Sequence, residues 1–67
     1  MLVEGVVEAF SDSRGDGFVI ANSGARYYFH CVTIADGTRT IEVGAKCTAR
    51  RIVGHLGVDE VADVAAL

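Results

Sequence analysis

The sequence contains no proline and no tryptophan, and only two of its 67 residues are cysteines. Two cysteines are too few to staple a small secreted scaffold, and Cys31 and Cys47 do not have the spacing of a zinc site. No apolar run approaches the roughly 20 residues that span a bilayer, and the first residues lack the basic and apolar regions of a signal peptide. We therefore expect a reduced, cytoplasmic protein that does not associate with membranes and that uses no metal or other cofactor.

Positive charge is also scarce. Six lysines and arginines stand against nine aspartates and glutamates, which gives a formal net charge of −3 at pH 7. This balance argues against strong nucleic-acid binding, because contacts from lysine and arginine to phosphates supply most of that affinity. Where the cations lie therefore matters more than their number. They are Arg14, Arg26, Arg39, Lys46, Arg50 and Arg51.

Short β-prone runs separated by glycine-containing turns make up most of the chain. They lie at residues 2–10, 18–21, 26–31, 45–53 and 58–65. The last run has a helical alternative, because Asp59, Glu60 and several alanines favour helix, whereas its valines favour a strand. With no linker and no repeat, the chain is predicted to be one domain over residues 1–67. We predict an all-β fold, a small five-stranded antiparallel barrel of the OB type.

Alternation of side chains along a strand predicts an aromatic cluster on the outer surface. In the third run, Tyr27 and Phe29 share one face and are predicted to lie in the core. Tyr28 and His30 then point outward, and in the second run Phe18 lies on the same outer side. An exposed group of aromatic side chains on adjacent strands is more informative than apolar residues scattered singly.

The two cysteines and the histidine beside Cys31 do not indicate catalysis. His30 and Cys31 are adjacent in a predicted strand, so their side chains point to opposite faces and do not converge. No acidic residue is placed in the sequence to orient the imidazole. We expect no catalytic residue, no enzymatic activity and no metal site, and we interpret Cys31 and Cys47 as separate thiols.

Three segments of the sequence resemble the bacterial cold-shock family. Residues 5–10, GVVEAF, resemble its opening strand, which usually reads glycine, two apolar residues, lysine, tryptophan and phenylalanine. Residues 14–19, RGDGFV, resemble the first RNA-binding motif of the family, and residues 27–30, YYFH, resemble the second. Both motifs occur in the family's order and separation, and the resemblance extends from about residue 5 to residue 64.

The resemblance implies a five-stranded antiparallel barrel that binds single-stranded RNA or DNA on its second and third strands, with RNA favoured. In the family, bases stack on exposed aromatic side chains of the two motifs. Carried over by position, the implied nucleic-acid-binding residues are Phe10, Arg14, Phe18, Tyr28 and His30.

Four positions depart from the family pattern in ways that predict weak binding. Glu8 replaces a lysine, Ala9 a tryptophan, and Asp16 and Cys31 each replace a phenylalanine. Each lost aromatic stacking surface removes about 1–3 kcal/mol per base, and the two acidic residues repel phosphate. The alternative hypothesis is therefore a cold-shock-like barrel whose face binds a protein partner or a second copy of itself.

Overall fold

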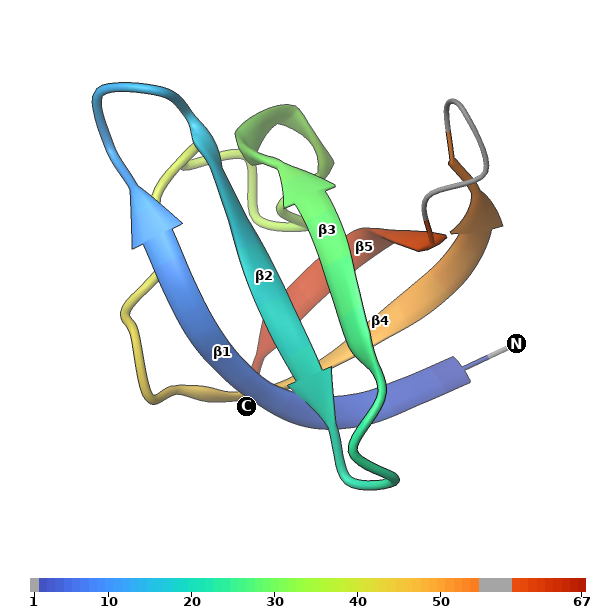
Figure 1. Ribbon diagram of the computed structural model, residues 1–67. Helices are drawn as coiled ribbons and strands as arrows, with labels where there is room; N and C mark the ends of the chain where they lie inside the picture. Colours follow the sequence, from blue (N-terminus) through green and yellow to red (C-terminus); the bar gives the residue numbers. More distant parts are fainter. Residues whose placement is uncertain (1, 55–58) are drawn as a thin grey trace.

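The computed structural model describes residues 2–54 and 59–67 and shows an all-β protein, as the sequence predicts (Figure 1). Val58, where the last strand was predicted to begin, lies outside the described residues. The only helical turn within them is a 3₁₀ turn, η1, at Cys31–Thr33. The five strands are β1 (Leu2–Ser11), β2 (Asp16–Ala21), β3 (Arg26–His30), β4 (Lys46–Val53) and β5 (Asp59–Ala66).

The strands form a closed barrel in the order β1-β2-β3-β5-β4, which fits a small OB-type barrel. The prediction of a purely antiparallel barrel is wrong, because β3 and β5 are parallel where Tyr28 faces Glu60. The connection from β3 to β4 explains this pairing. It leads to the edge of β1 that β2 does not occupy, where β4 pairs with β1 and runs antiparallel to it. Strand β5 then turns back along β4 and runs in the direction of β3.

Strand β1 closes the barrel because it pairs with β2 on one side and with β4 on the other. Gly5 lies where both pairings meet, opposite Ala21 and opposite Cys47. A Cβ atom at Gly5 would lie 2.1 Å from the carbonyl oxygen of Ile20, which is far inside van der Waals contact. Glycine at this position therefore allows the long, curved β1 of Figure 1 to approach β2 closely.

The core is filled by the inward faces of all five strands and by Ile34, which follows η1. Tyr27 and Phe29 are buried as the alternation predicts, and Phe29 is the largest fully buried side chain. Cys47 is buried and Cys31 is half-buried, and neither forms a disulfide, as expected. The buried core residues are Val3, Val7, Val19, Tyr27, Phe29, Ile34, Cys47, Ala49, Val61 and Val64.

A β-bulge at Glu8 sets which side chains of β1 reach the outer surface. Val7 faces Val19, but Ala9 faces Phe18, so β1 contains one residue more than β2 across this step. Residues directly opposite each other share a face of the sheet. The bulge therefore places Ala9 beside the outward Phe18.

Candidate nucleic-acid interface

Three aromatic side chains line the outer surface of β2 and β3, and we call them the aromatic row: Phe18, Tyr28 and His30. Phe18 lies opposite Tyr28, and His30 lies opposite Asp16. His30 is exposed, and Phe18 and Tyr28 are half-buried. The outward orientation predicted from the alternation is thus confirmed for the three positions.

The rings of the aromatic row touch each other edge to face. The ring centroids of Phe18 and Tyr28 are 5.6 Å apart with an interplanar angle of 68°, and those of Tyr28 and His30 are 4.9 Å apart with an angle of 86°. This is the favourable T-shaped geometry, which fixes each ring through its neighbour. The row therefore offers ring surfaces in a defined arrangement across two strands.

Asp16 ties one end of the aromatic row to the turn that precedes β2. Its Oδ2 accepts a hydrogen bond from the Tyr28 hydroxyl at 2.6 Å and another from Arg14 Nη2 at 3.1 Å. The hydrogen bond from Tyr28 lowers the pKa of Asp16 below its usual value, and Arg14 acts in the same direction. The same contact raises the pKa of Tyr28 above 10.0. Asp16 is therefore an ionised acceptor, and Tyr28 keeps its hydroxyl proton.

Arg26 covers the face of Phe18 at the other end of the row. Its guanidinium carbon lies 3.8 Å from the centre of the Phe18 ring, which is a cation–π contact. Its Nε donates to Glu8 Oε1, in the bulge of β1. Sequence reasoning did not include Arg26 among the site residues, although its even spacing from Tyr28 and His30 could have indicated the shared outer face.

Phe10, which the resemblance places in the site, stands apart from the aromatic row. Its ring stacks on the core residue Phe29 with centroids 5.9 Å apart and an interplanar angle of 12°. The bulge explains the difference, because it places Phe10 opposite the buried Gly17. Phe10 still lines a shallow hollow of about 160 Å³ between β1 and β2. The same hollow is lined by two other residues that the resemblance implies, Arg14 and Phe18, and by two that depart from the family pattern, Ala9 and Asp16.

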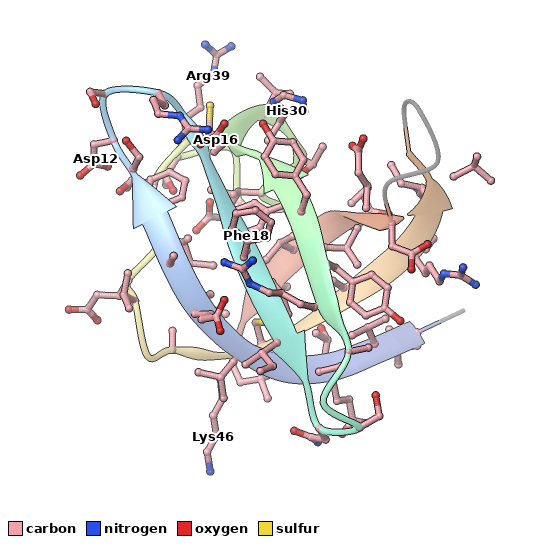
Figure 2. All side chains as sticks on the ribbon, in the orientation of Figure 1. Asp12, Asp16, Phe18, His30, Arg39 and Lys46 are labelled. Atoms are coloured by element: carbon pink, nitrogen blue, oxygen red, sulfur yellow. The ribbon has the colours of Figure 1, made fainter. Side chains whose placement is uncertain are left out.

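The two ion pairs beside the aromatic row cancel in charge. Arg14 pairs with Asp16 and Arg26 pairs with Glu8, so two positive and two negative charges give a net charge of zero. Two further arginines are also paired, Arg50 with Asp63 and Arg51 with Asp59. Figure 2 places Arg39 at the end of the barrel where Asp16 and His30 lie, and Lys46 at the opposite end. The face therefore combines aromatic surface with little positive potential.

Within residues 2–54 and 59–67, no three histidine, cysteine, aspartate or glutamate side chains gather closely enough to hold a metal ion. In the same part of the chain, no helix has the length and apolarity to cross a membrane. Edge-to-face rings flanked by arginines are suited to stacking of planar groups.

Comparison of the sequence with known proteins gives no relative: no protein-family model and no curated protein matches it.

Proposed function

We propose that this barrel is a non-enzymatic module that binds single-stranded nucleic acid, with RNA as the expected ligand, through the aromatic row and the hollow beside it. The observation that carries the proposal is the row itself, in which Phe18, Tyr28 and His30 lie side by side on the outer surface of two adjacent strands. Base stacking on such rings does not depend on sequence, because every base has a π-face. The resemblance to cold-shock proteins supports the same ligand class.

Weak binding follows from the charges around the row. Each arginine of the face is already paired with a carboxylate, so a phosphate has to compete with Glu8 for Arg26 and with Asp16 for Arg14. Arg26 also covers the Phe18 ring, so a base that stacks there has to displace the guanidinium group or stack on its plane. Stacking rather than phosphate contact is therefore expected to supply most of the affinity.

A second candidate function is protein binding or self-association through the same face. The cancelled charges favour it, because a neutral aromatic surface suits a protein partner better than a polyanion. The two candidates differ in a simple way. Nucleic-acid binding shifts the β2 and β3 amide resonances on titration with oligonucleotides at low salt. Self-association shifts the same resonances with protein concentration when no oligonucleotide is present.

Replacement of Tyr28 tests the proposal directly. Tyr28→Ala removes the central ring of the row, and we expect a loss of about 1–3 kcal/mol, or about 5- to 150-fold in affinity, for a short mixed-pyrimidine single strand. Tyr28→Phe is the matched control, because it keeps the ring and removes only the hydroxyl. Unchanged affinity in a natively folded Tyr28→Ala protein would show that the ligand does not use this face.

A further inference from the structure

Asp16 is held more firmly than Glu8, the acidic residue of the second ion pair, whose side chain is 37% exposed. The Asp16 side chain is only 13% exposed, and one oxygen, Oδ2, takes the hydrogen bonds from Tyr28 and Arg14. The other oxygen, Oδ1, accepts no hydrogen bond from the described residues, and none of their buried side-chain oxygens lacks a partner. Oδ1 therefore retains some contact with solvent, while two hydrogen bonds hold the carboxylate in place.

The Asp16 carboxylate lies beside the surface on which a base would stack. Asp16 is opposite His30 across the two strands, and its partner Tyr28 touches the His30 ring. Asp16 also lines the hollow shared with Phe18. Figure 2 shows Asp16, Phe18 and His30 on the same side of the barrel. A base that stacks on the row at this end therefore comes next to the Asp16 carboxylate, and an edge turned toward Asp16 can hydrogen-bond to it.

From this placement we infer that Asp16 makes the face select cytosine over uracil or thymine. This inference rests on the proposed function. An ionised carboxylate accepts hydrogen bonds and donates none. The exocyclic amino group of cytosine is a donor, and acidic side chains pair with it in nucleic-acid recognition. Uracil and thymine carry a carbonyl oxygen at that position, which the carboxylate repels. Asp16, which the sequence analysis interpreted as a lost stacking ring and a group that repels phosphate, thus becomes a specificity-determining residue.

Homo-oligomers of deoxycytidine and of thymidine, of equal length, test the inference at low salt with wild-type protein. We expect about tenfold tighter binding of the cytidine oligomer, which corresponds to one charge-assisted hydrogen bond of about 1.4 kcal/mol. An oligomer of N4,N4-dimethyldeoxycytidine keeps the ring but has no amino donor, and we expect its affinity to fall to that of the thymidine oligomer.

Two variants separate the hydrogen bond from the charge. Asp16→Asn presents both a donor and an acceptor, so we expect the preference for cytosine to disappear. Glu8→Gln removes a negative charge from the same face without touching Asp16, so we expect tighter binding of both oligomers and an unchanged ratio. A preference that persists in Asp16→Asn, or equal wild-type affinity for cytidine and thymidine oligomers, would overturn the inference and leave the proposed function standing. If the wild type binds neither oligomer, both fail.

Discussion

The cancelled charge of the two ion pairs on the proposed binding face leads to a quantitative expectation for Glu8→Lys. In the wild type, Arg14 and Arg26 are balanced by Glu8 and Asp16, so these four groups carry 2 − 2 = 0 charges. The substitution leaves three positive charges and one negative charge, or +2, and releases Arg26 from its ion pair. On single strands, each neutralised phosphate contributes a slope of about −0.7 to the logarithm of affinity against the logarithm of salt concentration.

Two phosphate contacts in the wild type give a slope of about −1.4, and the added lysine steepens it to about −2.1. Over a fourfold rise in salt, the affinity of the wild type falls about sevenfold and that of Glu8→Lys about eighteenfold. Fluorescence anisotropy with a labelled single strand measures both slopes. Glu8→Lys is also expected to bind more tightly than the wild type at the lowest salt concentration.

Glu4→Lys is the matched control for this experiment. It makes the same change in total charge on the same strand, but Glu4 lies four residues from Glu8, about 13 Å along β1. That separation exceeds the Debye length of about 10 Å at 0.1 M salt. Equal slopes for the wild type and Glu8→Lys would refute the reasoning, as would an equal steepening in Glu4→Lys. A wild-type slope much steeper than about −2 would place the contact surface on the arginines of β4.

Three further expectations follow from the structure. Ala9→Trp adds a ring beside the aromatic row, because the bulge turns residue 9 toward the row. Titration with a pyrimidine-rich single strand should show about tenfold tighter binding. Unchanged affinity would mean that the introduced indole ring does not join the row. Gly5→Ala forces a Cβ against the β2 backbone, and denaturant unfolding should show a loss of about 1–3 kcal/mol or more; native stability would mean that β1 can move away without cost. Asp16→Asn removes the carboxylate whose hydrogen bond and charge raise the pKa of Tyr28, so the phenolate absorbance of that residue should appear at lower pH than in the wild type, and an unchanged titration would contradict the hydrogen bond.

The directions of the two pKa shifts also fix the pH range in which the Asp16–Tyr28 hydrogen bond stabilises the fold. The pKa of Asp16 is lowered in the folded protein, so its contribution is present above the usual value of 3.8 and is lost as the pH falls through the folded value. The pKa of Tyr28 is raised, so its contribution is present below 10.0 and is lost as the pH rises through the folded value. Between these limits the contact holds.

The faces of β3 could be predicted from the sequence because alternation is strict where a strand has one buried side. Tyr27 and Phe29 fill the core and Tyr28 and His30 point out, as period-two spacing requires. The position of Phe10 could not be predicted in this way. One extra residue at Glu8 exchanges the two faces beyond it, and a bulge leaves no mark in the pattern of apolar and polar residues.

The sequence also could not predict the parallel pairing of β3 with β5 or the hydrogen bonds that Asp16 accepts. Which strands become neighbours depends on how the connection after β3 crosses the barrel, and local propensity does not report that path. The hydrogen bond from Tyr28 to Asp16 depends on the register between β2 and β3. In this register His30 lies directly opposite Asp16, and Tyr28 lies diagonally across from it, where its hydroxyl reaches the carboxylate. Composition correctly indicated a scarcity of positive charge, but not that both arginines of the face are paired with acids.

The double pairing of β1 has a consequence for the order in which the protein folds. The aromatic row lies on strands β2 and β3, which are neighbours in the chain and join through a short turn, so this part of the sheet forms from local contacts. Closure of the barrel depends on distant contacts, because residues 2–6 of β1 have to pair with residues 46–50 of β4. Contacts between residues so far apart in the chain slow folding to milliseconds or seconds in small β-proteins. The proposed binding surface is therefore expected to assemble before the barrel closes, and the edge of β1 stays exposed until β4 pairs with it.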